Sequence, residues 1–581
     1  MSGVLSRLAG RLRTGDLVSG ISRLLALACL VGLVGMLPWL SGKDPALTIL
    51  RATSSDREPT PEILNSIRKS IGIDGGPLHV IGHWLAGAAR GDLGRSWVSG
   101  TDVGPDAVDA FGVSLSLMAA ALGVGVIVAA ALVLPALRDG LRGRPRPRGG
   151  AASAVLISLP EYLLAPILML VLAVYLRILP PFGWGSPEKV IMPALSLGLP
   201  TGGYLGGLVS DAVTATFSER WVATWSTAGI RGRPLAGAVL RRALAPLTGQ
   251  VALVVVALTG GAVAVEKIFA IPGLGRELLD AASAQDVPAL QAQILLLLAL
   301  ALTTGVIAGA VRRLLMGRAA GAGGLTAPPP VEHPGRAARV IAVSGAALLA
   351  LMVAVGIRRD PYAVVADKLA QPSAALPLGA DSLGRDVLAR VAHGAVSTVS
   401  GAVIVTVVCF VIALLVGLAP RAAMGFIEVA NAAPPILAGL IVAGVSGPSA
   451  TGAAIAVAGV GWAPLASHAA GLVAENRQRP DVLLAPVLGE GRVRITLTRV
   501  LPAVVGPLAR HAALRLPGKA LALAALGFLG LGAQSPAPEW GLVLSDALPY
   551  IERAPWAVAT PAAALVILSI TSVAASRSMR R

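Results

Sequence analysis

The sequence contains few charged residues. Asp, Glu, Lys and Arg make up 14% of its 581 residues, whereas hydrophobic residues make up 55%. Because a soluble domain usually carries about 25% charged residues, this chain has too little polar surface to enclose several water-soluble cores. The scarcity of charge excludes an ordinary cytosolic enzyme and a disordered chain. We therefore predict an all-α protein that crosses a membrane several times.

The sequence also lacks the residue patterns of metal sites and nucleotide sites. Its two cysteines, Cys29 and Cys409, lie within apolar runs, which argues against a disulfide framework or a thiolate metal site. No cluster of His, Cys and carboxylate residues has metal-ligand spacing. No segment matches Gly-x-x-x-x-Gly-Lys-[Ser/Thr], the loop that cradles ATP phosphates. We therefore predict no catalytic residue, no cofactor and no metal, and we expect that the chain is not an enzyme.

Twelve apolar runs are long enough to cross a bilayer, because a crossing helix needs about 20 mostly apolar residues. These runs predict a polytopic membrane protein of about 12 transmembrane helices. They cover residues 19–40, 111–136, 152–179, 189–209, 249–267, 289–311, 339–356, 398–419, 423–446, 451–472, 511–533 and 558–575.

The net charge of +17 is concentrated in alternate loops. Both termini and every second loop are rich in Arg, whereas the long loops 41–110 and 357–397 hold nearly equal numbers of basic and acidic residues. Cytoplasmic loops of membrane proteins carry the excess of Lys and Arg. We therefore predict a multi-pass protein of the cell membrane, with both termini in the cytoplasm and the two long loops outside. The charge is an orientation signal and does not indicate nucleic acid as a partner.

The two parts of the sequence repeat one another in order. A Leu-Gly-Arg element occurs in each long outer loop, at residues 91–96 and 381–386, and a Gly-Leu-Gly segment follows the fifth span of each part, at 273–275 and 530–532. An ordered set of repeated elements favours a parallel repeat of two six-helix halves.

The segment 318–337 separates these two halves. It is rich in Gly, Ala and Pro and has no apolar periodicity, which is typical of a linker. We predict a first half at 1–317 and a second half at 338–581, joined by this linker in the cytoplasm. The core transmembrane domains are expected at about 111–315 and 396–576.

Each half has a long basic inner loop with a similar pattern. We interpret the pattern as a short helix, a turn that needs glycine, and a second helix that ends near a proline. Such a unit can insert into a groove of a cytoplasmic partner. The pattern runs through Ala228, Gly229 and Pro246 in the first loop, and through Ala485, Gly489, Leu501 and Pro502 in the second.

These inner loops resemble those of the integral-membrane subunits of bacterial ATP-binding-cassette (ABC) importers. The hallmark of that family is Glu-Ala-Ala, three residues, Gly, and a Leu-Pro about a dozen residues later. The chain departs from the hallmark at Leu483, which stands where the family has its acidic residue. The resemblance implies that both loops contact cytoplasmic ABC ATPase subunits.

The resemblance is closest to the dipeptide, oligopeptide and nickel permeases, and it covers nearly the whole chain. Residues 44–110 and 266–275 are similar to the first permease subunit, whereas 376–394 and 526–541 are similar to the second. The resemblance therefore implies that two subunits, usually separate chains, are fused as two type I importer halves. It also implies transport by alternating access of a peptide or a related solute (nickel, glutathione or an opine) delivered by an extracytoplasmic solute-binding protein.

The Gly-Leu-Gly segments have two interpretations. Glycine lets backbone enter a constriction where a side chain would clash, which makes Gly273, Gly275, Gly530 and Gly532 candidates for an outer gate or for the pathway. Alternatively, each segment is only a tight extracellular turn. Glu266 is a further pathway candidate because an ionisable residue in a span is costly, but it also lies near a span end, where an interfacial position is the plainer interpretation.

Two other functions remain open from the sequence alone. An ion-gradient-driven secondary transporter with twelve helices would have the same number of spans, although such carriers usually lack two long outer loops with matching motifs. Uptake by the chain alone would favour it. A membrane receptor or scaffold that senses a binding protein is the other alternative, and no appended signalling domain supports it.

Overall fold

The computed structural model describes most of the chain. The predicted linker 318–337 lies outside the described residues except at its last two positions, and the predicted span 19–40 lies outside them in part. The described residues are 21–22, 24–26, 28–29, 31–37, 44, 46–47, 49–50, 58–70, 76–144, 150–157, 159–284, 286–316 and 336–578.

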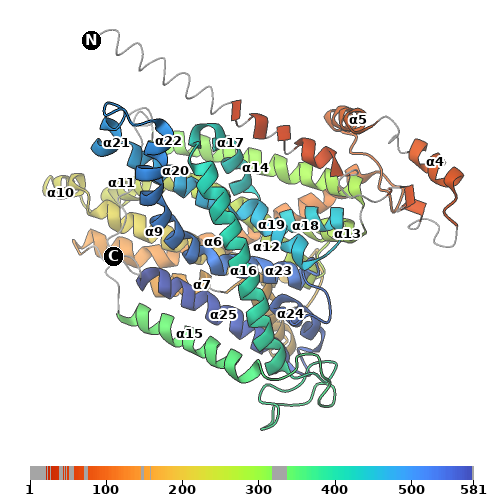
Figure 1. Cartoon of the computed structure of the whole chain (residues 1–581). Helices are drawn as coiled ribbons and strands as arrows, with labels where there is room; N and C mark the ends of the chain where they lie inside the picture. Colours follow the sequence, from red (N-terminus) through yellow and green to blue (C-terminus); the bar gives the residue numbers. More distant parts are fainter. Residues whose placement is uncertain are drawn as a thin grey trace. The chain divides into compact units, whose positions relative to one another are not determined.

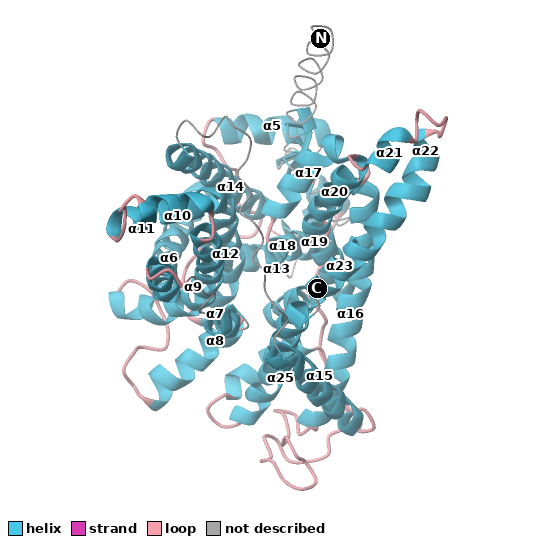
Figure 2. Cartoon of the chain, turned by 90° about the vertical axis from the view of Figure 1, so that its left-hand side faces the viewer, coloured by secondary structure: helices cyan, strands magenta, loops and turns pink. Residues whose placement is uncertain are grey.

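The regular structure of the described residues is helical. Figure 2 shows helices joined by loops, and these residues form isolated β-bridges but no strand. Helices are the expected solution for apolar segments, because lipid offers no hydrogen bonds and each backbone N–H and C=O must find its partner within the segment. The predicted all-α class is confirmed.

Eight helical stretches of the described chain are long and apolar enough to cross a membrane. The predicted run 423–446 adds a ninth if a bent pair counts as one span: α17 (Pro420–Ala432) and α18 (Pro435–Ser446) meet at an angle of 93°. The eight stretches are Val103–Leu141, Arg233–Ile268, Val287–Leu315, Arg339–Gly356, Val387–Gly417, Ala450–Arg477, Arg492–Leu529 and Pro555–Ser572.

The predicted run 152–179 is not one helix, and that prediction is wrong. Helix α7 (Gly150–Ile157) ends before Pro160, and α8 (Glu161–Leu168) begins after it and continues as the π-helix η2 (Met169–Tyr175). Proline has no N–H to donate, and it disfavours helical geometry at the residue before it. Pro160 therefore divides the apolar run into two pieces.

The predicted run 189–209 forms the centre of α9 (Pro187–Phe217), which packs closely on α6 (Val103–Leu141). A Cβ added at Gly202 of α9 would lie 2.7 Å from the carbonyl oxygen of Gly125 on α6. Small residues let two membrane helices approach closely enough for their backbones to touch. The stripe on α9 that faces α6 consists of Gly198, Gly202 and Gly206.

The described chain divides into two compact units, and each unit takes segments from both predicted halves of the sequence. The predicted halves thus describe the order of the sequence, whereas each compact unit is built from residues of both halves. The first unit contains described residues of 1–104, 281–292 and 394–542, and the second contains those of 105–280, 293–393 and 543–581.

Pairs of neighbouring helices build each unit. In the second unit, α15 (Arg336–Gly356) lies along α25 (Pro555–Ser578) (Figures 1 and 2), and α12 (Thr248–Ile268) packs against α8 and α9. In the first unit, α18 and α19 (Ala450–Gly461) are neighbours that pack on α23 (Leu501–Leu529). The other helices with defined bounds are α4 Pro61–Ser70, α5 Pro77–Ala89, α10 Arg220–Thr227, α11 Arg233–Leu244, η3 Ala245–Leu247, α13 Leu274–Ala284, α14 Val287–Met316, α16 Val387–Gly417, α20 Ala463–Arg477, α21 Pro480–Leu484, α22 Arg492–Ile495, η5 Thr496–Val500, α24 Trp540–Ala547 and η6 Leu548–Tyr550.

Candidate functional site

The first inner loop is a helical hairpin made by α10 and α11. Helix α10 ends at Thr227, and Ala228 and Gly229 lie exposed in the turn that follows. Gly229 has a φ of 84°, in the left-handed region that glycine adopts without steric cost. Ile230 N donates a hydrogen bond of 2.9 Å to the carbonyl of Trp225, which closes the turn. The predicted short helix and glycine turn are present here.

A compact apolar cluster anchors the first inner loop to the long helices. Residues of α10 and α11 bury their apolar side chains against α9 and α6. An ion pair of 3.0 Å between Arg242 of α11 and Glu219 ahead of α10 closes the base of the hairpin. The loop is therefore fixed to the helices beneath it. The cluster consists of Val133, Ala212, Val213, Phe217, Val222, Leu235, Val239 and Ala243.

The second inner loop has the same plan and a more apolar tip. Ala485 is buried after α21, and Gly489 is exposed with a φ of 79°. Four apolar side chains of this tip are largely exposed: Val487 is 81% exposed and Leu488 74%. Exposed apolar patches of this kind are typical of surfaces that contact another protein or a membrane. The tip consists of Leu483, Leu484, Val487 and Leu488.

Arg499 holds the second inner loop in shape. Its guanidinium donates to both carboxylate oxygens of Glu490, at 2.5 and 3.1 Å, and to the carbonyl of Asp481 at 3.0 Å. These hydrogen bonds lower the pKa of Glu490 below its ordinary value. Sequence reasoning missed this pair, and the only signal for it was an acidic residue next to Gly489 with an arginine nine residues later.

The second short helix of each loop ends near the proline. Helix α11 ends at Leu244, two residues before Pro246, which lies in the 3-10 turn η3. In the second loop α22 and the π-helix η5 run to Val500, and Leu501 and Pro502 are the first residues of α23. The helical stretch nevertheless continues past each proline into the next long helix. Because proline has no N–H to donate, the regular α-helical hydrogen bonding is interrupted at both places.

The first Gly-Leu-Gly segment closes around Glu266, which is completely buried at the end of α12. The carboxylate of Glu266 accepts hydrogen bonds from Ser114 Oγ of α6 at 2.6 Å and from Arg276 N of α13 at 3.0 Å. A Cβ at Gly273 would lie 2.5 and 2.6 Å from the two oxygens of this carboxylate, and a Cβ at Gly275 would lie 2.8 Å from the backbone of α12. At both positions the neighbouring atoms lie so close to the backbone that only glycine fits.

The second Gly-Leu-Gly segment ends α23. Gly530 has a φ of 83°, and its N–H donates to the carbonyl of Gly527 at 3.0 Å, which terminates the helix in the left-handed conformation. Gly532 is buried, and a Cβ there would lie 3.0 Å from Gly527 Cα. Gln534 Nε2 donates to both carbonyls, of Gly530 at 3.2 Å and of Gly532 at 3.0 Å. The two segments share a sequence, but the glycines of the first make room for Glu266 and α12, whereas Gly530 of the second ends a helix.

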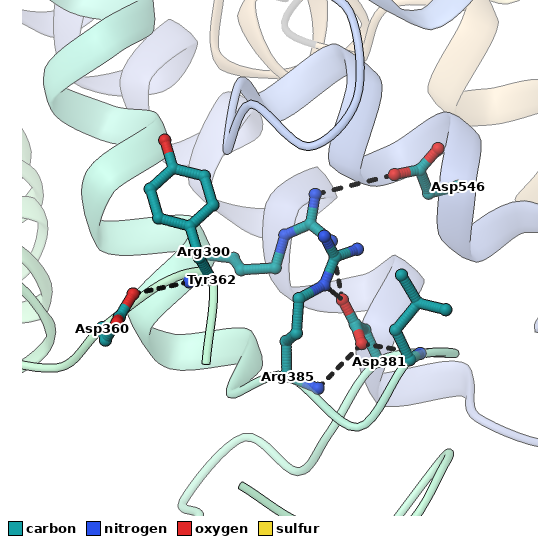
Figure 3. Close-up of polar contacts among 7 residues, drawn as sticks. Asp360, Tyr362, Asp381, Arg385, Arg390 and Asp546 are labelled. Carbon is teal, nitrogen blue, oxygen red and sulfur yellow. Dashed lines mark hydrogen bonds and ion pairs between the residues drawn. The ribbon is translucent and has the colours of Figure 1, made fainter. Parts of the chain in front are cut away.

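Two buried arginines converge on Asp381 in the second outer loop (Figure 3). Asp381 accepts from Arg385 Nε at 2.7 Å and from Arg390 Nη1 at 2.6 Å, and the side chain of Arg390 is only 1% exposed. Arg390 also faces Asp546 of α24, with Nη2 and Oδ2 3.6 Å apart. Burial raises the pKa of Asp546, while Arg385 lowers it. This cluster fixes the Leu-Gly-Arg element to α16 and to α24.

The first Leu-Gly-Arg element is held in a different way. Its arginine, Arg95, is exposed and pairs with Asp102 at 3.3 Å. Its serine, Ser96, donates to Asp286, and Trp97 N donates to the same carboxylate at 3.1 Å. Asp286 directly precedes α14, the last long helix of the first half. The same motif therefore anchors an outer loop in both halves, with a buried arginine only in the second.

The described structure is that of a multi-pass helical membrane protein with two inner loops of one plan and two glycine-rich segments after long helices. A family model described as "Binding-protein-dependent transport system inner membrane component" matches residues 150–320 and 407–580, which together are more than half of the chain. The chain therefore belongs to this family, and it contains two copies of the permease domain. It is the membrane permease component of a binding-protein-dependent ABC importer, located in the inner membrane.

Three relatives illustrate this membership. The di/tripeptide transport system permease protein DppC of Pseudomonas aeruginosa is 35% identical over 204 residues, which are 34% of this chain and 67% of the relative. The peptide transport system permease protein SapC of Escherichia coli is 36% identical over 202 residues, 33% of this chain and 67% of the relative. The metal-staphylopine import system permease protein CntB of Staphylococcus aureus is 29% identical over 281 residues, 48% of this chain and 89% of the relative.

Proposed function

We propose that this chain supplies both membrane halves of an ABC importer, so that one polypeptide does the work of two permease subunits. The observation that carries the proposal is the double family match, at 150–320 and 407–580. Because 281 aligned residues are 89% of the staphylococcal relative and only 48% of this chain, that relative is about half as long. The membership and the apolar spans support a permease over an ion-driven carrier.

The two inner loops are the proposed docking sites for cytoplasmic ABC ATPase subunits. Each presents a short helix and a glycine turn, and each is fixed to the long helices by buried side chains or by an arginine network. A push on either loop is therefore transmitted to the helices without being absorbed by loop flexing. The proposed contact residues are Ala228, Gly229 and Pro246 in the first loop and Ala485, Gly489, Leu501 and Pro502 in the second.

The orientation follows from the charge. The inner loops hold the Arg excess, which supports cytoplasmic loops and cytoplasmic termini. The two outer loops then face an extracytoplasmic solute-binding protein. Glu266 and the glycine segments 273–275 and 530–532 lie toward the same side, as parts of the proposed gate or pathway.

The proposed substrate is a di- or tripeptide or a short peptide. Two of the relatives carry peptide transport in their names. A metal–staphylopine complex is a second candidate, because the relative named for metal-staphylopine import aligns over nearly half of this chain. Nickel, glutathione and opines are further members of the same solute group.

Reconstitution in proteoliposomes tests the proposed function. We expect that the chain, together with its matched ATPase and binding protein, hydrolyses ATP faster when the binding protein is loaded. Solute uptake by the chain alone, driven by an ion gradient, would contradict the proposal, and so would the absence of stimulation with matched partners.

A substitution in the second inner loop tests the docking surface. Leu488→Asp places a charge on an apolar tip that must be buried on docking, and an unpaired buried charge is expensive. We expect the affinity for the ATPase to fall at least about tenfold. Leu488→Met, which keeps the side chain apolar, is the matched control and should bind normally. Equal binding by Leu488→Asp and the control would show that this tip is not the docking surface.

A further inference from the structure

One short helix in each half begins against a buried carboxylate: α13, which starts within the first Gly-Leu-Gly segment, and α24, which follows the second. In the first half this is Glu266 with α13, described above. In the second half it is Glu539, which directly precedes α24 and is 8% exposed. Glu539 accepts from Gly541 N and Leu542 N, both at 3.0 Å, and from Thr398 Oγ1 of α16 at 3.2 Å. Each carboxylate therefore joins the start of a short helix to a hydroxyl on a long one.

The two hydroxyl groups occupy equivalent positions. Ser114 is the twelfth residue of α6, and Thr398 is the twelfth residue of α16. Both helices are the first long helix after an outer loop in their half. The hydroxyls also touch the short helices directly, because Leu274 N donates to Ser114 Oγ at 2.8 Å and Trp540 N donates to Thr398 Oγ1 at 3.4 Å. The two sites are thus versions of one arrangement.

The carboxylate and a glycine have exchanged positions between the two halves. Glu266 lies two residues before the end of α12, and Gly527 lies two residues before the end of α23. Gly273 directly precedes α13, where the second half has Glu539 directly before α24. One half thus carries its carboxylate on the long helix and its glycine before the short helix, and the other half has the reverse.

Each site has room for a single carboxylate. A Cβ at Gly273 would collide with the carboxylate of Glu266, and a Cβ at Gly527 would lie 3.0 Å from Glu539 Cδ and still closer to its Oε2. Two glutamates would clash and repel each other. Two glycines would leave the N–H groups of the short helix and the hydroxyl without their acceptor, and an unpaired buried polar group is costly. The arrangement therefore requires one glutamate and one glycine in each half.

We propose that Glu266 and Glu539 are equivalent positioning residues that fasten the gate: each locks the short helix of its half to the first long helix of that half. The locked segments move as one rigid body during transport, since separating them would leave a buried carboxylate without its donors. This inference rests on the proposed function for its role in gating, whereas the lock itself is a property of the chain alone.

An exchange of the two residues in the second half tests the lock. The variants are Glu539→Gly, Gly527→Glu, and the double variant Gly527→Glu/Glu539→Gly, which reproduces the arrangement of the first half. Glu539→Gln keeps the shape of the side chain and guards against a loss of folding, and Glu552→Gln, an exposed glutamate after α24, is the matched control. Hydrogen–deuterium exchange on the full chain in nanodiscs needs no partner.

We expect amides of residues 540–547 to exchange at least about tenfold faster in Glu539→Gly, because removing a hydrogen-bonded charge weakens the start of the helix. The double variant should return to within about threefold of the parent, and Glu539→Gln should lie between them. A double variant that exchanges as fast as Glu539→Gly, or a single variant that exchanges like the parent, would overturn the lock.

The gating role is tested by measuring ATP hydrolysis in the presence of the matched ATPase and binding protein. The ratio of binding-protein-stimulated to basal hydrolysis should fall toward one in Glu539→Gly and recover in the double variant. A ratio that stays at the parental value while exchange accelerates would overturn the gating role. Failure of the parent chain itself to be stimulated would instead count against the proposed function and leave the exchange data to decide on the lock.

Discussion

Asp381 is the residue whose loss should cost most in the second outer loop. It is the acceptor for two guanidinium groups that are 5% and 1% exposed, those of Arg385 and Arg390. Asp381→Asn would leave two buried charges facing a neutral side chain, and breaking a buried pair costs about 3 kcal/mol or more. We expect the free energy of unfolding, measured in mixed micelles, to fall by about that amount. Asp360→Asn, at an exposed carboxylate that accepts from Tyr362 N at 2.8 Å, should change it little, and equal losses would contradict the prediction.

Glu277 on α13 should make stability depend on pH. Burial raises its pKa from 4.5 to about 7, with repulsion from Asp106, Glu266 and Asp280 adding to the shift. The folded protein therefore holds this proton more tightly than the unfolded chain does, so stability is highest below about pH 4.5 and falls as pH rises toward 7.

The substitution Glu277→Gln should remove that loss. At pH 8.5 we expect the variant to be more stable than the parent by roughly 1 kcal/mol, a value reduced for the partial exposure of the site, and at pH 4.5 we expect no gain. Thermal unfolding of the variant and the parent at both pH values measures this difference in stability. Glu188→Gln, on an exposed glutamate of α9, serves as the control. A gain of the same size at both pH values would contradict the assigned cause.

At the scale of elements, the glycine stripe on α9 sets its distance from α6. Gly202→Ala adds a Cβ only 2.7 Å from the Gly125 carbonyl, so the two helices must separate and lose packing along their contact. We expect a loss of about 2 kcal/mol in unfolding free energy. Gly123→Ala adds the same group on α6 where nothing lies within 4 Å, and it should be neutral or slightly stabilising. Equal effects of both variants would show that the stripe is not a contact.

The whole molecule raises the question of whether its two sequence halves can be separate chains. Each compact unit takes segments from both halves, so neither 1–317 nor 338–581 should be stable when expressed alone. Co-expressed, the two chains should assemble, because the contacts within each unit do not depend on the covalent link. The assembly should be weaker than the parent by the loss of effective concentration. Co-purification of the two chains measures it, and a monodisperse single half would contradict the prediction.

Sequence reasoning reached the class of the molecule and the position of both inner loops, and it stopped where distant residues meet. Apolar length predicts spans, and Gly229 and Gly489 could be placed in turns because local backbone geometry dictates glycine. The partners of Glu266 could not be predicted, since Ser114 is 152 residues away. Glu539 was missed as a site residue for a related reason. Its counterpart Glu266 lies on the long helix α12, whereas Glu539 directly precedes the short helix α24, so a position-by-position comparison of the two halves does not align them.

Helix α6 (Val103–Leu141) joins two places far apart along its length. It carries Ser114 beside the proposed gate and, further along, Val133, Leu137 and Leu141 in or against the apolar cluster of the first inner loop. Ser114 and Leu141 are about 40 Å apart along a continuous helix. In the proposed mechanism the helix acts as a lever, because a tilt of about 10° around its middle would displace each end by about 3.5 Å. The stroke at the proposed gate would then be set by the length of one helix, and no separate signal between the two faces of the membrane would be needed.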